Sequence, residues 1–480
     1  MKHLQPSRRN FIKWTGGTFA VLSLPACADT EKPEEYKPGN YNSPNTTPNQ
    51  NNPGPDEMMP MEMGGVTEEE VSAWEAEGVL NANEPGEWAD KIVGHYPMVK
   101  RSGNQVMVMV PHAMDEEHYI EAIYVKNYDG ELVASKRLSA NDEYAIAEFT
   151  VSDDSELTVY SVCNLHQVWS APVVRTPFEP GPWGEKIIGH TPKVKVEGDQ
   201  ALVTVPHPMT EEHYIVGLYL TDQDGNVIGK TQLSPSDMAS YTFTIPEGTD
   251  EVQPWALCDD HDLWMGQSVS LEDVEYVYNY ESTGILTADE PGQWGEKIAG
   301  HYPLVMINDN MITVNVAHPM DADHYIEAIY LKDSEGNLLG FKKLSPGDQA
   351  TALFMVVDSE AEYYAYAMCN LHEVWSAPIV RSGDRPGPWG EKVNSHTPTI
   401  EVGPGTATVT VPHPMDEEHY IAAIYLTDTD GAVVAKKQLN PQEYQEAQYT
   451  FELPAGLTTV TPWALCDDHD LWSGPTVTVS

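Results

Sequence analysis

The stretch Pro206-His207-Pro208-Met209-Thr210-Glu211-Glu212-His213-Tyr214 returns four times along the chain, with small changes each time. Every copy contains the same three parts in the same order: a lone histidine in a Gly/Ser-His-Tyr/Thr-Pro setting, a His-x5-His pair, and a Cys-x2-His motif. The lone histidines are His95, His190, His301 and His396. The pairs are His112/His118, His207/His213, His318/His324 and His413/His419. The closing motifs are Cys163/His166, Cys258/His261, Cys369/His372 and Cys466/His469.

The histidine and cysteine counts show that these sets are not accidental. The chain has 17 His and 5 Cys, and four copies of four His and one Cys leave only His3 and Cys27 over. A single histidine is more often a core or surface imidazole than a ligand, but scattered histidines do not sort into four equal sets. Because imidazole and thiolate are ligands for transition metals, the sequence predicts a site with four nitrogen donors and one sulfur donor in each copy.

The spacing of the copies predicts the domain organisation. His95 and His301 are 206 residues apart, and so are His190 and His396, which indicates that a two-domain unit was duplicated whole. The capping box Thr67-Glu68-Glu69-Glu70 predicts a short helix that ends at about Glu77. The predicted segments are a signal (1–27), a disordered linker (28–65), a helix and connector (66–83), repeat one (84–177), repeat two (178–270), a connector (271–289), repeat three (290–383) and repeat four (384–480).

Within each repeat the pattern is that of β-strands. Runs such as 105–110, 119–126 and 157–162 are short and rich in Val, Ile, Tyr and Thr, and turn dipeptides such as Asp129-Gly130 separate them. About seven such strands in about ninety residues predict an all-β chain of four tandem antiparallel β-sandwiches of immunoglobulin-like type. Since proline cannot donate to a sheet ladder, we expect the His-x5-His segments to be loops at one end of each sandwich.

The N-terminus predicts export. Ser7-Arg8-Arg9-Asn10-Phe11-Ile12-Lys13 resembles a twin-arginine signal, and the apolar run 14–26 is too short to span a bilayer as a helix. This run ends at Leu24-Pro25-Ala26-Cys27, which resembles a bacterial lipobox, so we predict a periplasmic or cell-envelope lipoprotein with lipid on Cys27. An ordinary thiol at Cys27 is the alternative. The linker 28–65 is dominated by Pro, Asn, Glu and Gly, a composition typical of a disordered tether.

The net charge excludes one class of partner, and the placement of the cysteines argues against disulfide bonds. With 74 acidic and 26 basic residues the formal net charge is −48, which excludes nucleic acid as a partner because that binding requires Lys and Arg against phosphates. The charge is typical of a solvated surface, so the lipid at Cys27 is the only membrane contact that we predict. An exported protein can form disulfides, but the other four Cys occupy the same place in four repeats, which favours ligand thiolates.

The motif set resembles that of the superoxide reductase family, the iron domain of neelaredoxin and desulfoferrodoxin. That family has an upstream His followed by x-Pro, a His-Pro-x4-His pair and a Cys-Asn-x-His-Gly-x-Trp motif, and the likeness covers residues 84–480. The resemblance implies one Fe(2+)/Fe(3+) ion per repeat, up to four, held by four equatorial imidazoles and an axial cysteinate. It also implies an open sixth position at which superoxide is reduced to hydrogen peroxide.

Ligand chemistry and cysteine count extend this interpretation. Five ligands of this mixture suit a redox metal with a vacant position better than the closed tetrahedron of structural zinc, and a thiolate trans to the vacancy donates electron density to iron. Desulfoferrodoxins can carry a second, four-cysteine iron centre, but all 5 Cys are already assigned here. We therefore predict an external electron donor, a cytochrome or a small redox protein.

The chain departs from the family pattern beside the lone histidines and beside the cysteines. The family places Glu-Lys directly before the lone His, whereas a Lys lies four residues upstream here. These lysines, which we predict to be catalytic by drawing in superoxide, are Lys91, Lys186, Lys297 and Lys392. Ordinary surface lysines are the alternative. Repeats two and four have Asp259-Asp260 and Asp467-Asp468 where repeats one and three have Asn-Leu. Acids beside the thiolate are expected to lower the potential of iron and repel an anion, which favours repeats one and three as the catalysts. Solvated loop carboxylates are the alternative.

Two function classes remain open from the sequence. The first is an exported superoxide reductase with four sites, and the alternative is a non-catalytic iron-binding or electron-transfer protein of the cell envelope. A structural array of sandwiches with inert histidines is disfavoured by the four complete ligand sets.

Overall fold

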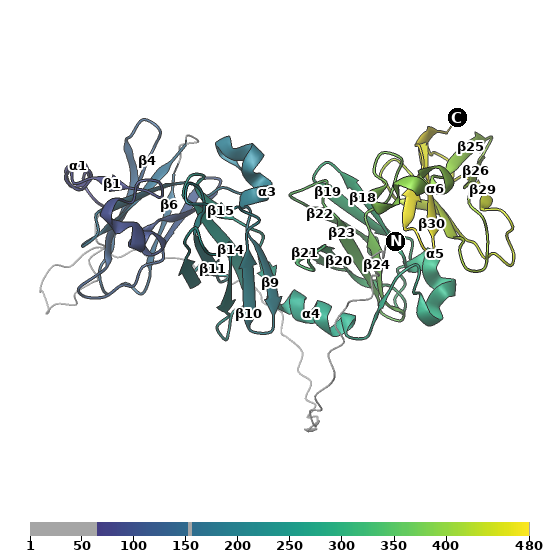
Figure 1. Cartoon of the computed structure of the whole chain (residues 1–480), viewed down its shortest axis with the longest axis horizontal. Coiled ribbons are helices and arrows are strands. Elements are labelled where there is room, and N and C mark those ends of the chain that lie inside the picture. The colour runs from purple at the N-terminus through teal and green to yellow at the C-terminus, as the bar shows by residue number, and fades with distance from the viewer. Residues whose placement is uncertain (1–64, 152–155, 480) are drawn as a thin grey trace, which may run out of the picture. The chain divides into compact units, whose positions relative to one another are not determined.

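The computed structural model describes residues 65–151 and 156–479, which form an all-β protein of tandem antiparallel sheets with few helices (Figure 1). This confirms the predicted fold class. Each repeat has a three-stranded sheet and a larger sheet in which the cysteine-bearing strand has a neighbour on both sides. Within the described residues, none of the helices combines the length and the apolar character that crossing a bilayer requires.

Repeats one and two show the common plan. In repeat one the small sheet is β2 (Met98–Ser102), β3 (Gln105–Val110) and β6 (Ala145–Thr150), and the large sheet is β1 (Val79–Leu80), β8 (Val168–Pro172), β7 (Thr158–Cys163), β4 (Ile120–Lys126) and β5 (Leu132–Arg137). In repeat two the small sheet is β13 (Ser240–Thr244), β10 (Gln200–Thr204) and β9 (Lys193–Glu197), and the large sheet is β12 (Val227–Gln232), β11 (Ile215–Thr221), β14 (Glu251–Cys258) and β15 (Leu263–Met265), with β16 (Val269–Ser270) also on β14.

Repeats three and four follow the same plan in the same order. In repeat three the small sheet is β18 (Pro303–Asn308), β19 (Met311–Val316) and β22 (Thr351–Met355), and the large sheet is β17 (Ile285–Leu286), β24 (Glu373–Pro378), β23 (Tyr363–Cys369), β20 (Ile326–Asp333) and β21 (Leu338–Lys343). In repeat four the small sheet is β25 (Thr399–Gly403), β26 (Thr406–Thr410) and β29 (Gln448–Glu452), and the large sheet is β28 (Val433–Gln438), β27 (Ile421–Thr427), β30 (Thr459–Cys466) and β31 (Leu471–Ser473), with β32 (Val477–Thr478) on β30.

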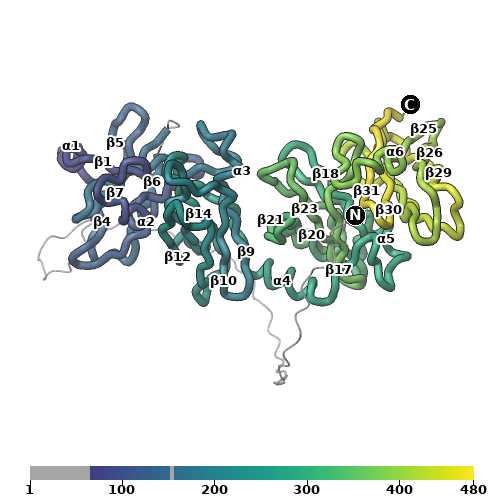
Figure 2. The backbone as a smooth tube through the Cα atoms, in the orientation of Figure 1, coloured from purple at the N-terminus to yellow at the C-terminus, as the bar shows by residue number. Residues whose placement is uncertain are grey.

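Two longer helices precede repeats one and three. Helix α1 (Glu68–Glu75) begins at Thr67, whose hydroxyl accepts from the Glu70 N–H while the Glu70 carboxylate accepts from the Thr67 N–H, the reciprocal pair of a capping box. Helix α4 (Leu271–Glu281) begins at Ser270 and leads into β17, as Figure 2 shows. After each helix a two-residue strand, β1 or β17, joins the large sheet in parallel with β8 or β24. The sequence did not predict these parallel strands.

The apolar cores join repeats in pairs. One buried cluster combines side chains of repeats one and two, including Trp169 and Trp255, and another combines repeats three and four, including Trp375 and Trp463. Burying an aromatic or aliphatic side chain of this size contributes about 1.5–3 kcal/mol. Each pair is therefore held together by its own core.

The segment between the members of a pair is fixed by an arginine. The backbone of Arg381 pairs with β31, donating to Leu471 O and accepting from Ser473 N. Its side chain is 1% exposed and forms ion pairs with Asp470 at 3.1 Å and Glu362 at 2.8 Å. Arg175 makes the matching ion pair with Asp262 at 3.1 Å. A buried charge is stable only with such partners.

Candidate metal centres

The lone histidine of each repeat ends a short helical turn. Every turn is a 3-10 segment followed by four α-helical residues: η1 (Gly86–Lys91) and α2 (Ile92–His95), η2 (Gly181–Lys186) and α3 (Ile187–His190), η3 (Gly292–Lys297) and α5 (Ile298–His301), η4 (Gly387–Lys392) and α6 (Val393–His396). In repeat one the Nδ1–H of His95 donates to the backbone oxygen of Lys91 at 2.9 Å, and the other three repeats have the same bond. This bond fixes the tautomer in which Nε2 is free to be a ligand.

The His-x5-His pairs lie in loops, as the motif prolines predict. In repeat one the backbones of Asp115 and His118 exchange two hydrogen bonds of 3.0 and 3.2 Å, which closes a tight turn before β4. The Nδ1–H of His112 donates to the carbonyl of Ala113, so its Nε2 also faces the site. A register shift in β4 between Ile120 and Ala122, repeated in all four copies, sets the strand directly after the pair against the cysteine strand.

The Cys-x2-His motif occupies a strand end and the following turn. Cys369 is the last residue of β23, and His372 lies in the turn to β24. The next residue, Glu373, has a positive φ of 65°, and the indole N–H of Trp375 donates to His372 O at 3.1 Å. Both features recur in the other repeats and present Nδ1 of this histidine to the site.

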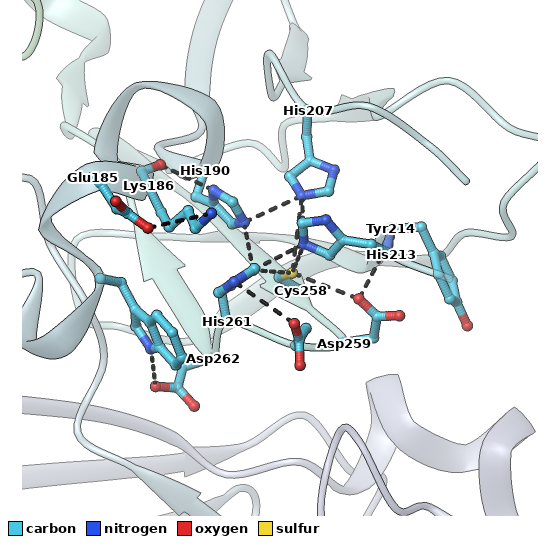
Figure 3. A network of polar contacts seen from close by, with 12 residues as sticks. Glu185, Lys186, His190, His207, His213, Tyr214, Cys258, Asp259, His261 and Asp262 are labelled. Atoms are coloured by element: carbon cyan, nitrogen blue, oxygen red, sulfur yellow. Dashed lines mark hydrogen bonds and ion pairs between the residues drawn. The ribbon is translucent and has the colours of Figure 1, made fainter. Parts of the chain in front are cut away.

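The four imidazoles form a square in repeats two and three, and in repeats one and four three edges of the same ring measure 2.9–3.2 Å. In repeat three the ligand nitrogens of His301, His318, His324 and His372 are 3.0, 3.0, 3.0 and 2.9 Å apart around a closed ring. Metal–nitrogen bonds of about 2.1 Å at right angles place neighbouring nitrogens about 3.0 Å apart. Repeat two has the same closed ring, with edges of 2.8–3.2 Å (Figure 3). The donor atoms are spaced as ligands of one ion.

The cysteine sulfur lies on one side of this square. Cys369 Sγ is 3.6 Å from His318 Nε2 and 3.4 Å from His372 Nδ1, and Figure 3 shows Cys258 in the same relation to its histidines. In repeats one and three all five donor atoms lie within 4.8 Å of one another. In repeats two and four, four of them meet that limit, and the fifth, on His207 or His413, lies 3.1 Å from its ring neighbour. Among the described His, Cys, Asp and Glu residues, none supplies a sixth donor to these groups.

Burial sets the protonation of the donors. It lowers the pKa of His190 and His301 to about 3 and of His207 and His318 to about 4, so these imidazoles are neutral at pH 7. Burial raises the pKa of the Cys258 thiol to about 12, which a bound cation reverses because it stabilises the thiolate. The donor set therefore fits a divalent or trivalent transition metal.

The residue after each cysteine has a structural role that the sequence did not reveal. In repeat one Asn164 accepts from the backbone N–H of Tyr119 at 3.0 Å and donates to Glu117 O. In repeat two the carboxylate of Asp259 accepts from Tyr214 N at 3.1 Å and lies 3.7 Å from Cys258 Sγ. Asp259 and Asp467 thus keep the loop in place and add a negative charge beside the sulfur.

The second acid of repeats two and four faces a ligand from outside. A carboxylate oxygen of Asp260 is 3.7 Å from His261 Nε2, and Asp468 is 3.6 Å from His469 Nε2. Repeats one and three have the exposed residues Leu165 and Leu371 at these positions. A carboxylate at the outer nitrogen makes an imidazole ligand more basic.

The four predicted catalytic lysines lie beside the sites. Each contributes its backbone oxygen to the lone histidine, while its ammonium is partly exposed; Lys91 pairs with Asp90 at 2.9 Å and Lys186 with Glu185 at 3.7 Å (Figure 3). Burial, then the charges of His118 and Lys91, lower the pKa of His166. Lys186, Lys297 and Lys392 act in the same direction on the corresponding histidines. Their catalytic role stays a prediction.

The predictions for the N-terminus concern residues that the structure does not describe. The twin-arginine stretch 7–13, the lipidation site Cys27 and most of the linker 28–65 lie outside the described residues. Residue His3, left over by the ligand sets, lies there too.

Fold and site together define a metal-binding β-sandwich array with a His4Cys set in each repeat. A family model described as desulfoferrodoxin matches residues 87–172, 294–378 and 389–475, which together exceed half of the chain. The chain therefore belongs to the desulfoferrodoxin family, and its four His4Cys sets are iron sites of that family, one per repeat. Repeat two lies outside the matched ranges but carries all five ligands.

Relatives of known sequence match a stretch about as long as one repeat. A desulfoferrodoxin homolog from Archaeoglobus fulgidus is 41% identical over 80 residues, which are 16% of this chain and 61% of that protein. Desulfoferrodoxin from Clostridium acetobutylicum is 40% identical over 82 residues, or 16% of this chain and 62% of that protein. The chain thus spans about three-fifths of the length of these curated relatives.

Solved structures with similarity to the chain include two superoxide reductases. The enzyme from Treponema pallidum is 31% identical and covers 17% of this chain and 67% of its own, with a TM-score of 0.15. The superoxide reductase (1Fe-SOR) from Giardia intestinalis is 32% identical and covers 17% of this chain and 96% of its own, with a TM-score of 0.16. The family assignment rests on the family model and the ligand sets.

Proposed function

We propose that this protein reduces superoxide to hydrogen peroxide, with electrons from an external donor such as a cytochrome or a small redox protein. One observation carries the proposal: four nitrogens form a square, a sulfur lies on one side of it, and no sixth His, Cys, Asp or Glu among the described residues completes the set. Iron bound in this set supplies one electron to superoxide, which takes up two protons and leaves as hydrogen peroxide.

The chain's own groups prepare this chemistry. Backbone N–H groups stabilise the thiolate: Leu165 N donates to Cys163 Sγ at 3.4 Å. The tryptophan of each helical turn packs edge-on against the Cys-x2-His histidine, with ring centroids between 4.5 and 4.8 Å apart, and so fixes the plane of that ligand. Fixed ligands need little rearrangement between oxidation states, which favours fast electron transfer.

Iron content and turnover test the proposal together. After anaerobic purification we expect close to four irons per chain and, on mixing with superoxide, peroxide formation with oxidation of the iron. Zinc in place of iron, or four irons that superoxide does not oxidise, would refute the reductase function.

The upstream lysines are proposed to draw in the anion. Replacing Lys297 by Ala is expected to slow superoxide reduction with iron content unchanged, since its charge acts on His372 at the site. Glu296→Gln, beside it in η3, is the matched control and should not slow the reaction. An unchanged rate in Lys297→Ala removes this lysine from the mechanism.

A second role, electron transfer without catalysis, is favoured in repeats two and four by one observation. Asp259 and Asp260 place two carboxylates against the ligands of repeat two, and Asp467 and Asp468 do so in repeat four. Negative charge there stabilises ferric iron and opposes the approach of an anion. Superoxide that oxidises only two of four irons directly supports this division, and equal direct rates at all four refute it.

We also propose export by the twin-arginine route and attachment through lipid on Cys27. Support comes from the twin arginines at 8 and 9 and from the lipobox-like residues that end at Cys27. In a bacterial host with a twin-arginine translocase, Arg8→Lys with Arg9→Lys should keep the protein in the cytoplasm. Cys27→Ser should release it from the membrane fraction, and unchanged membrane attachment would exclude the lipid.

A further inference from the structure

In repeats two and four, a lysine reaches across the interface between the two repeats of a pair, which we call the seam. It lies beside the site of the other repeat of that pair. Lys230 in β12 of repeat two donates from Nζ to the backbone oxygen of Pro111 in repeat one. Lys436 in β28 of repeat four donates in the same way to Ala317 O in repeat three. Pro111 and Ala317 directly precede the ligands His112 and His318. Each ammonium is thus anchored one residue from an iron ligand of the neighbouring repeat.

The same ammonium groups lie close to the segment of a second ligand. A Cβ placed on Gly300 would lie 3.3 Å from Lys436 Nζ, and one placed on Gly94 would lie 3.7 Å from Lys230 Nζ. Gly300 and Gly94 directly precede the lone histidines His301 and His95. Because His301 and His318 are neighbours in the square, Lys436 lies between the segments that carry one edge of it.

A cavity connects this lysine with the site. At the seam of repeats three and four, a cavity of about 520 Å³ has His318 and Lys436 in its wall, together with the polar side chains of Asn315, Asp348, Gln349 and Thr351. The Asp348 carboxylate accepts from Ser345 N at 2.7 Å, so part of its charge is already satisfied.

The arrangement is specific to the sites of repeats one and three. The lysines stand 206 residues apart at equivalent positions, where repeats one and three have Ser135 and Phe341. The neighbouring lysines of the odd repeats, Lys136 and Lys342, donate instead to Ile146 O and Thr351 O within their own repeats. No described contact brings them to the sites of repeats two and four.

We propose that Lys230 and Lys436 are positioning residues that guide small monovalent anions to the iron sites of repeats one and three. The inference rests on the proposed function for its substrate, superoxide, and adds that the odd sites are completed by the even repeats. In a chain of formal net charge −48, long-range steering opposes an anion, so a cation fixed beside the ligands is needed to reverse the local field. The pair of repeats is then the functional unit.

Azide, as a small monovalent anion, tests the inference separately from turnover. The full-length, four-iron protein is oxidised, and azide affinity is measured from the change in its visible absorption. In Lys230→Gln/Lys436→Gln, two of the four sites should lose about fivefold or more in azide affinity, the effect of one unit charge at about 4 Å in water. The second-order rate with superoxide should fall and should lose part of its dependence on ionic strength.

Two further variants separate charge from structure. Lys437 lies in the same strand as Lys436, and its ammonium lies over Tyr444 and Tyr449, 5.4 and 5.3 Å from the ring centroids. Lys437→Gln removes this charge and should change neither the azide affinity nor the rate with superoxide. Lys230→Arg/Lys436→Arg should restore azide affinity. If the Gln variant fails to load iron, Lys436→Met, which keeps the aliphatic stem, replaces it in the same comparison.

The outcomes distinguish this inference from the proposed function. Unchanged azide affinity in the Gln and Met variants, or an equal loss in Lys437→Gln, overturns the inference. If azide affinity falls in the Gln variant but the wild-type protein does not reduce superoxide, the proposed function is refuted and the inference stands.

Discussion

Val93 of repeat one occupies the space that a side chain at Gly217 of repeat two would need: Val93 Cγ2 lies 2.6 Å from the position of a Cβ on Gly217. Repeats three and four have Ala299 and Ala423 at the equivalent positions, each 206 residues further on. The space at this position is therefore filled by a valine opposite a glycine between repeats one and two, and by two opposed alanines between repeats three and four. Close packing of this kind makes the seam sensitive to single methyl groups.

Gly217→Ala should destabilise the pair of repeats one and two by about 1–3 kcal/mol, because the added methyl group overpacks the seam against Val93. Adding Val93→Ala should recover most of this loss, since the double variant recreates the alanine pair of repeats three and four. Denaturant unfolding of the single and double variants measures the coupling. Ala299→Val is the reciprocal control and should destabilise the other pair; additive effects would show that Val93 and Gly217 do not share this space.

Replacing Cys369 by Ser should remove the thiolate-to-iron absorption of repeat three alone. Cys369 Sγ is the only sulfur in that ligand set, so the band of the oxidised protein should fall by about one quarter of its intensity if four sites contribute equally. Optical spectra normalised to iron content provide the measurement. Cys27→Ser is the matched control because Cys27 precedes the four repeats in the sequence and belongs to none of the repeated motifs. An undiminished band in Cys369→Ser would contradict the axial assignment.

The four irons should titrate as two classes. Asp259 lies 3.7 Å from Cys258 Sγ and Asp260 lies 3.7 Å from His261 Nε2, so negative charge favours ferric iron in repeats two and four. Their potentials should lie below those of repeats one and three. Asp259→Asn with Asp467→Asn should raise the lower potential on the order of 60 mV, which corresponds to about 1.4 kcal/mol for one electron. A spectroelectrochemical titration with one unsplit wave would contradict this.

Metal loading should release one proton per site at pH 7. Burial lowers the pKa of His190 to about 3 and that of His207 to about 4 and raises that of Cys258 to about 12, so these two imidazoles are already neutral at pH 7 and the thiol has a proton to lose. Adding ferrous iron to metal-free protein in weak buffer, with a pH indicator, should therefore release close to four protons per chain. Release of eight or more would show that the histidines are protonated before loading.

The metal-free protein should lose stability in acid over a defined range. In the unfolded chain the imidazoles bind protons near pH 6.5, while burial lowers the pKa of His190 and His301 to about 3 in the folded chain. Between these values the unfolded state binds more protons, so stability falls as the pH decreases from about 6.5 toward 3. Melting temperatures of metal-free protein at several pH values measure this, and a midpoint independent of pH above 4 would contradict it.

The ligand sets could be predicted because their signal is local and repeated. Counting His and Cys grouped the residues that the structure brings together, and alternating strand patterns predicted the all-β fold. Helix α1 was expected to end at about Glu77 and ends at Glu75, because the N–H groups of Glu77 and Gly78 donate to Trp74 O and Glu75 O in a tighter turn that reaches Gly78 at a φ of 114°. The parallel strands β1 and β17 are two residues long and have no pattern to detect.

Contacts between repeats could not be predicted from the sequence. Lys230 and Lys436 looked like any surface lysine, because only the packing of two repeats brings them to Pro111 and Ala317. Likewise Asp259 and Asp467 were recognised as charges beside the sulfur, but their bonds to the backbone of Tyr214 and Tyr420 depend on the folded loop. Contacts between residues that are far apart in the chain produce no local pattern in the sequence.

The core that repeats one and two share also has a consequence for biosynthesis. Side chains of repeat two, Tyr219 and Trp255 among them, complete a cluster that begins in repeat one. When repeat one has left the ribosome, its apolar face stays exposed until β14 of repeat two has been synthesised. A nascent chain with such an exposed face is prone to aggregate. A ribosome that pauses near helix α4 instead presents a finished pair. We therefore expect chaperones to be needed twice per chain, once while repeat two is synthesised and once while repeat four is synthesised.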